Sequence, residues 1–132
     1  MKRVKVAGGA DNQMGHAGEV ILTARIVVYR SGDVPRAITL SAQAFSVGRE
    51  SSCDVVVDHP EVSRLHAIIE PVVDGFRVVD PGSRNGVIVN GQPLREPWLL
   101  HPGDRIQIGD VDLVYSVDDP WRQETQVVPT IS

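Results

Sequence analysis

The chain favours β-branched side chains so strongly that its fold class follows from them. It has 22 valines and 9 isoleucines against 7 leucines. Such side chains fit the pleated surface of a β-sheet and lose rotamer freedom in a helix. The 12 glycines and 9 prolines are spread along the chain, and they interrupt every stretch of about 12 residues that approaches a helical period. The sequence therefore predicts an all-β sandwich or barrel of short strands.

Turn signals divide the apolar runs into about ten strands. Asp74-Gly75 and Asn90-Gly91 are hairpin dipeptides, and Gly109-Asp110 separates the last two runs. The predicted strands are Val20–Arg30, Arg36–Ser41, Ala44–Val47, Val55–Val57, His66–Val73, Phe76–Asp80, Val87–Val89, Gln92–Leu94, Arg105–Ile108 and Val111–Val117.

The 132 residues supply one hydrophobic core rather than two. We interpret residues 20–117 as one domain of two packed sheets. Residues 1–19 are expected to be a flexible or extended lead-in with a candidate strand at 3–6, and residues 118–132 a flexible tail. We expect a loop from Pro97 to Asp104, with Trp98 plugging one end of the sandwich.

Charge and composition exclude several classes of protein. The net charge of −4 argues against general nucleic-acid binding, which needs a basic face. No run reaches the ~18 apolar residues of a membrane helix, and the basic start is not followed by the apolar segment of a secretory signal. The single cysteine, Cys53, excludes a disulfide framework and a cysteine-rich zinc site. We expect a cytoplasmic protein without a metal or other cofactor.

Three polar loops each carry an arginine, namely Arg49, Arg64 and Arg84. Guanidinium groups and serine hydroxyls suit phosphate oxygens, so the loops would form a site for a dianion if they met. Spacing alone does not decide whether the loops meet. The predicted strand Val55–Val57 between the first two loops would carry the chain to the opposite end of the sandwich, unless the chain switches sheets. The alternative is that arginine is simply the usual cation of this chain, which has 11 arginines and two lysines.

The order of these loops resembles the forkhead-associated (FHA) domain family. The family pattern is Gly-Arg, Ser-x-x-His, Ser-x-Asn-Gly, Val-Asn-Gly and Gly-Asp-x-Ile-x-Ile-Gly. The matching blocks begin at Gly48, Ser63, Ser83, Val89 and Gly103 and occur in this order. Each block is weak alone, but together they are highly specific over residues 20–117. The resemblance implies an eleven-stranded β-sandwich, antiparallel or mixed, that binds phosphothreonine peptides through the loops at one end.

The resemblance also implies roles for individual positions. Arg49 would clamp the phosphate, Ser63 and Arg64 would add donors beside it, and Asn85 would hold the peptide backbone. The remaining candidates for phosphopeptide contact are Ser83 and Arg84. The positions expected to be structural, by tying loops together or by giving the backbone room or a positive φ, are Gly48, His66, Gly86, Asn90 and Gly91.

Three positions depart from the family pattern, of which Val87, where threonine is frequent, is expected only to extend a strand. Arg84 stands where the family commonly has threonine, and it either supplies a charged donor or points to solvent. Glu61 precedes Ser63 by two residues, where relatives often read the third residue after the phosphothreonine. The acidic Glu61 is therefore expected to disfavour a peptide whose third residue after the phosphothreonine is acidic.

We therefore predict an adaptor module of Ser/Thr kinase signalling, with a phosphothreonine-containing protein, a kinase or its substrate, as partner. The alternative is a structural interaction domain of the same fold that binds unphosphorylated proteins. We do not expect an enzyme. Ser63, His66 and Asp80 lack the nucleophile elbow of a hydrolase, and Cys53 lacks the downstream arginine of a phosphatase loop.

The tail contains two candidate phosphate acceptors, Thr125 and Thr130, among four threonines in the chain. The third residue after Thr125 is aliphatic Val128, which is compatible with Glu61. The resemblance places the chain ends opposite the binding loops, and the tail is too short to reach the loops of its own domain. Phosphorylated Thr125 is therefore expected to bind a neighbouring molecule head-to-tail, or another protein.

Overall fold

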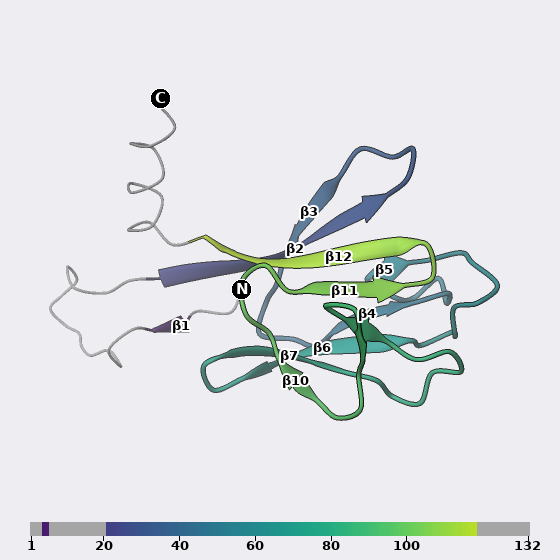
Figure 1. Ribbon diagram of the computed structural model, residues 1–132. Coiled ribbons are helices and arrows are strands. Elements are labelled where there is room, and N and C mark those ends of the chain that lie inside the picture. Colours follow the sequence, from purple (N-terminus) through teal and green to yellow (C-terminus); the bar gives the residue numbers. More distant parts are fainter. Residues whose placement is uncertain (1–3, 6–20, 119–132) are drawn as a thin grey trace, which may run out of the picture.

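Two β-sheets pack face to face in the computed structural model, which describes residues 4–5 and 21–118 (Figure 1). Within these residues no helix has the length and apolarity that a membrane span requires. The strands are β1 (Val4–Lys5), β2 (Ile21–Arg30), β3 (Arg36–Thr39), β4 (Phe45–Gly48), β5 (Val55–Val56), β6 (Ala67–Val72), β7 (Gly75–Val79), β8 (Ile88–Val89), β9 (Gln92–Pro93), β10 (Trp98–Leu99), β11 (Arg105–Ile108) and β12 (Val111–Asp118).

The larger, seven-stranded sheet has the order β1-β2-β12-β11-β8-β9, and β3 pairs with β2 outside this path. Its longest ladder joins β2 to β12, from Arg30 opposite Val111 to Thr23 opposite Asp118. The two ends of the domain sequence are thus neighbours in one sheet. The short β1 continues this arrangement, because it pairs with residues 21–22 at the start of β2.

The smaller, five-stranded sheet has the order β10-β7-β6-β4-β5. Strands β4 and β5 run parallel, with Val47 opposite Val55 and Gly48 opposite Val56. Strand β6 runs antiparallel to both β4 and β7. The sheet is therefore mixed, and its parallel pair decides where the loops around it lie.

Two of the three turn dipeptides lie where the sequence predicts them, Asn90-Gly91 between β8 and β9 and Gly109-Asp110 between β11 and β12. The other turn is shifted by one residue, because Val73-Asp74 connects β6 to β7 and Gly75 is already in β7, opposite Val72. The Asn90-Gly91 turn has φ angles of 51° and 82° at its two residues. A two-residue turn of this kind matches the right-handed twist of its strands, and asparagine and glycine tolerate the positive φ better than other residues.

The core lies between the sheets and consists mainly of β-branched side chains. Alternation along the strands produces it, as in β11, where Ile106 and Ile108 are buried while Arg105 and Gln107 are exposed. The largest fully buried apolar side chains include Phe76, Ile26, Leu40, Ile69 and Leu113. Burying one such side chain contributes about 1.5–3 kcal/mol, so this core accounts for most of the stability.

The predicted all-β sandwich is confirmed, with three differences in detail. The described residues form twelve strands rather than eleven, because two-residue pairings such as β10 are included. Strand β10 lies within the segment from Pro97 that was expected to be a loop. Trp98 does not plug an end of the sandwich. It lies on this edge strand with 43% of its surface exposed.

Candidate functional site

Three loops meet at one end of the five-stranded sheet, and the register of the strands explains why. The loop 49–54 leaves β4 and returns to the start of β5, which runs parallel to β4, so both strands end on the same side. The loop 57–66 leaves β5 there and enters β6, and the loop 80–87 leaves β7, whose Val79 lies opposite Ile68. The clustering that spacing left undecided is present because β4 and β5 are parallel.

Backbone hydrogen bonds tie the first loop to the second. The Arg49 N–H donates to the Ser63 carbonyl at 3.0 Å, and the Glu50 N–H donates to the Arg64 carbonyl at 3.1 Å. Gly48 makes this approach possible, since a Cβ at this position would collide with the Arg64 carbonyl oxygen. The Cys53 thiol donates to the same oxygen at 3.4 Å. The two loops therefore form one rigid unit around Arg64.

The guanidinium of Arg49 is held at one edge. Its Nε donates to the Val62 carbonyl at 2.9 Å, which fixes the plane of the group beside the second loop. Among the described residues its two terminal nitrogens have no hydrogen-bond partner, and the residue is exposed. An anchored planar fork with free donors is the arrangement that binds phosphate oxygens in a bidentate manner.

The arginines of the three loops lack the carboxylate partners that most of the strand arginines have. Within residues 21–118, Arg49, Arg64 and Arg84 form no ion pair and all are exposed. Four strand arginines are paired with a carboxylate: Arg25 with Asp118, Arg30 with Asp110, Arg77 with Glu70 and Arg105 with Asp112. The three loops thus present guanidinium groups that no described carboxylate engages, in a protein whose net charge is −4.

The hydroxyl of Ser63 is oriented by the third loop. Its Oγ accepts a hydrogen bond from the Arg84 N–H at 2.9 Å. This bond uses a lone pair and leaves the hydroxyl hydrogen available for an external acceptor. Arg84 takes part through its backbone, and its side chain is exposed.

His66 is the buried link between the second and third loops. It is 1% exposed. Its Nδ1 accepts from the Ser63 N–H at 3.0 Å, so the proton of a neutral ring must be on Nε2, which donates to the Gly86 carbonyl at 2.7 Å. This imidazole therefore fixes the backbone on both sides of the proposed phosphate site without facing it.

Asn85 and Glu61 lie together at the edge of the site. The Asn85 Nδ2 donates to the Glu61 carbonyl at 2.7 Å, and the Glu61 N–H donates to His59 Nδ1 at 3.0 Å. The Glu61 carboxylate is left exposed. The amide oxygen and the second amide hydrogen of Asn85 remain for a ligand.

Ser83 is engaged within its own loop. Its hydroxyl donates to Asp80 Oδ2 at 3.0 Å and accepts from the Gly86 N–H at 3.0 Å. Burial opposes ionisation of Asp80, but hydrogen bonds from the backbone of Ser83 and Gly82 outweigh this and hold the pKa of its carboxyl below the ordinary value. Ser83 thus shapes the turn, and its hydroxyl hydrogen is already used.

Comparisons with known proteins agree with this geometry. The family model of the FHA domain matches residues 45–109. The chain is 35% identical over 115 residues to the oxoglutarate dehydrogenase inhibitor of Corynebacterium efficiens, a match covering 87% of this chain and 80% of that protein. This chain belongs to the FHA-domain family. The resemblance noted in the sequence is thereby confirmed.

Other relatives of this FHA domain are longer proteins. It is 37% identical over 93 residues to the glycogen accumulation regulator GarA of Mycolicibacterium smegmatis, covering 70% of this chain and 58% of that one. Among solved structures, Mycobacterium tuberculosis EmbR in complex with a low-affinity phosphopeptide superposes with a TM-score of 0.64 at 33% identity, covering 71% of this chain and 24% of that chain.

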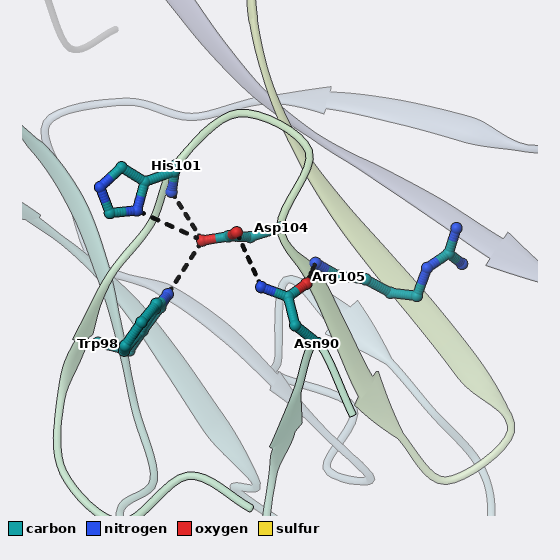
Figure 2. Close-up of polar contacts among 5 residues, drawn as sticks. All are labelled: Asn90, Trp98, His101, Asp104 and Arg105. Carbon is teal, nitrogen blue, oxygen red and sulfur yellow. Dashed lines mark hydrogen bonds and ion pairs between the residues drawn. The ribbon is translucent and has the colours of Figure 1, made fainter. Parts of the chain in front are cut away.

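At the opposite end of the FHA domain, Asn90 belongs to a second polar cluster (Figure 2). Its Nδ2 donates to Asp104 Oδ1 at 2.9 Å, and its Oδ1 accepts from the Arg105 N–H at 2.9 Å. The other carboxylate oxygen of Asp104 accepts from the Trp98 indole N–H at 3.0 Å and from the His101 N–H at 2.8 Å. The cluster fastens the β8–β9 turn and the segment before β11 to strand β10.

The sequence analysis did not assign roles to Asp80, Trp98 or Asp104 in these clusters. Asp80 had a local signal, since an aspartate three residues before a serine at a Pro-Gly turn is a common side-chain cap. Asp104 had its place in the late Gly-Asp motif. Trp98 had no local signal, because its partner is reached only through the fold. Within residues 4–5 and 21–118 no His, Cys, Asp and Glu side chains group as metal ligands.

The Asp104 cluster should make the domain sensitive to acid. Burial opposes ionisation of this carboxyl, but hydrogen bonds from Asn90, His101 and Trp98 outweigh it and lower its pKa. A lowered folded-state pKa stabilises the fold above the unfolded value of about 3.9, and the contribution is lost as the pH falls through the folded value. We expect Asp104→Asn to lower the free energy of unfolding by about 1–3 kcal/mol at pH 7. The difference in unfolding free energy between wild type and variant should narrow below about pH 4.

Urea denaturation of both proteins between pH 7 and pH 2 measures this effect. The matched control is Asp33→Asn, since Asp33 is an exposed loop residue and should change little at any pH. A gap that stays constant as the pH falls would show that the charge of Asp104 is not what stabilises the cluster.

Proposed function

We propose that the loop end of this FHA domain binds a phosphothreonine peptide, with Arg49 and Ser63 as the phosphate contacts. The observation that carries the proposal is the junction of the first two loops. There the anchored fork of Arg49 and the oriented hydroxyl of Ser63 are connected by the 3.0 Å hydrogen bond from Arg49 N–H to the Ser63 carbonyl. Arg64 and Arg84 add charge around this pair, and Asn85 is available for the peptide backbone.

The relatives support an adaptor rather than an enzyme. One was solved with a phosphopeptide bound, and others are named an inhibitor and a regulator. The chain therefore acts by binding a phosphothreonine-containing protein, a Ser/Thr kinase or its substrate, without catalysing a reaction. The proposal places it in the cytoplasm, and Cys53, a free thiol, suits a reducing compartment.

Titration of a phosphothreonine peptide tests the proposal. The phosphopeptide should bind at pH 7, and its unphosphorylated form should not bind measurably. Affinity should fall as the pH drops from about 7 to 5, since the second phosphate pKa is about 6 and the monoanion offers less charge to the arginines. Isothermal calorimetry or fluorescence anisotropy provides the measurement.

A series of peptides varied at the third residue after the phosphothreonine extends this titration to Glu61. The exposed carboxylate of Glu61 should disfavour an aspartate or glutamate at this peptide position and tolerate valine or arginine. The Glu61→Arg variant should instead prefer the peptides with an aspartate or glutamate at this position. Equal affinity for the phosphorylated and unphosphorylated peptides would instead favour an interaction domain that does not read phosphate.

We also propose that phosphorylated Thr125 is a ligand for this site in a second molecule. Thr125 and Thr130 lie outside the described residues, but β12 ends at Asp118, at the end away from the three loops. The eight residues of β12 extend about 24 Å back toward those loops, and the loops belong to the other sheet, which packs about 10 Å away. Thr125, seven residues beyond Asp118, reaches at most ~25 Å. Even a fully extended tail therefore barely spans this distance, which favours a site in a second molecule.

Light scattering of the Thr125-phosphorylated chain should show a mass that grows with concentration, since a heterologous contact can continue from molecule to molecule. The Arg49→Ala variant should remain a monomer. A phosphorylated chain that stays monomeric at every concentration, with its site still open to added phosphopeptide, would exclude this association.

A further inference from the structure

A groove lies beside Trp98, where the β8–β9 hairpin of one sheet faces strand β10 of the other. Its volume is about 280 Å³. The lining is mainly apolar, from Val89, Pro93, Leu94 and Trp98, and Arg95 and Glu96 also line it. The groove adjoins the Asn90-Gly91 turn and so lies away from the three phosphate loops.

The ring of Trp98 is a preformed wall of this groove. Its only polar group, the indole N–H, is bound to Asp104 at 3.0 Å (Figure 2), and His101 packs against the ring with the centroids 6.3 Å apart. The side chain is thus fixed while 43% of the residue stays exposed. An exposed tryptophan with its polar group satisfied loses little conformational entropy on contact and anchors apolar side chains well.

The charged residues at the groove indicate which kind of segment would bind in it. Arg95 and Glu96 are exposed, and neither forms an ion pair within residues 21–118. A segment that complements the groove would have short aliphatic or proline side chains for the apolar wall. It would also carry one acid and one base nearby for Arg95 and Glu96.

We propose that the chain's own segment Val127-Val128-Pro129 occupies this groove, with Glu124 and Arg122 placed near Arg95 and Glu96. The 14 residues that follow Asp118 contain this apolar run and both charges. Glu124 and Arg122 lie three and five residues before Val127, close enough to reach the groove's charged edge. The docked segment is the unphosphorylated one, because phosphate on Thr125 or Thr130 would bring negative charge toward Glu96.

The strand geometry allows this docking within one molecule. The Tyr115 N–H donates to the Asp104 carbonyl at 2.9 Å, so β12 passes the Trp98–Asp104 cluster three residues before Asp118. Those three residues extend ~10 Å, and the two strand spacings from β12 to β8 add ~10 Å sideways. Val127 lies nine residues beyond Asp118 and can reach ~30 Å, about twice the distance needed.

Paramagnetic broadening tests the proposal on the full chain. A nitroxide is coupled to the thiol of the Thr130→Cys variant in a Cys53→Ser background, and the indole N–H peak of Trp98 is followed by NMR. The chain has two tryptophans, so the Trp121→Phe variant assigns the Trp98 peak. We expect this peak to lose most of its intensity, and Val128→Asp to restore it. The control Val34→Asp, at a valine 87% exposed near the other end, should leave the broadening unchanged.

Mixing two differently labelled samples shows whether the groove binds the tail of its own molecule or that of a second copy. Isotope-labelled chain without nitroxide, mixed with unlabelled chain that carries it, should show no broadening of Trp98. Broadening in the mixture would assign the groove to a second copy and overturn the proposal. An unbroadened Trp98 peak in the labelled chain, or broadening that persists in Val128→Asp, would also overturn it.

Discussion

Arg49→Ala is expected to weaken phosphopeptide binding by about ten- to hundredfold, the largest effect of any surface substitution in this domain. The change removes charge-assisted hydrogen bonds worth about 1.5–3 kcal/mol. The fold should survive, since the residue is exposed and its backbone bond to Ser63 remains. Titration of one phosphothreonine peptide against wild type and variant gives the ratio.

The matched control is Arg105→Ala, which removes an exposed arginine that pairs with Asp112 on the sheet. It changes the net charge equally and should leave affinity within about twofold, because long-range charge effects are screened beyond about 10 Å at ordinary salt. Equal losses in the two variants would mean that binding depends on overall charge and not on the fork held beside Val62.

His66→Ala should lower the free energy of unfolding by about 3–5 kcal/mol, the largest stability loss we expect in the loop region. The substitution leaves the Gly86 carbonyl and the Ser63 N–H without partners, at about 1–3 kcal/mol each, and opens a cavity at a side chain that is 1% exposed. Since a small domain has only 5–15 kcal/mol in all, the variant should be marginally folded. Urea denaturation measures the loss.

Two conservative variants separate the two hydrogen bonds of the imidazole. His66→Gln can keep a donor near the Gly86 carbonyl, and His66→Asn can keep an acceptor near the Ser63 N–H. Each should recover part of the stability that His66→Ala loses. Losses as large as that of His66→Ala in both variants would indicate that packing, and not the bridge between the loops, determines the stability at this position.

Most of the strands could be predicted because their signals are local. Alternating valines and isoleucines and the turn dipeptides Asp74-Gly75 and Asn90-Gly91 identify segments such as β6, β7 and β11 within one or two residues. Strand β10 could not be predicted in this way. Trp98 and Leu99 become a strand only by pairing with Val78 and Arg77 about twenty residues earlier, and a two-residue strand has no periodicity of its own.

The chemistry of the candidate site was readable in the sequence, but its assembly was not. The order of the motifs around Arg49, Ser63 and Asn85 predicts which residue types belong together. It does not show that the Arg49 Nε reaches the carbonyl of Val62, or that the Ser63 hydroxyl accepts a hydrogen bond from the Arg84 N–H. These contacts depend on loop backbone positions, which follow from the parallel pairing of β4 with β5. The paired residues are only eight positions apart, but the alternation of apolar residues does not show that the connecting loop crosses back to make the pair parallel.

The ladder between β2 and β12 has a consequence for how the protein is made. It joins residues 23–30 to residues 111–118 across almost the whole domain, so β12, an inner strand of the larger sheet, is the last of the described strands to leave the ribosome. Topologies dominated by such distant pairings fold slowly, in milliseconds to seconds. A nascent chain that stops before β12 exposes the unpaired edges of β2 and β11 and leaves one face of the core open to water. The three loops can acquire their binding geometry only after the last strand has been synthesised.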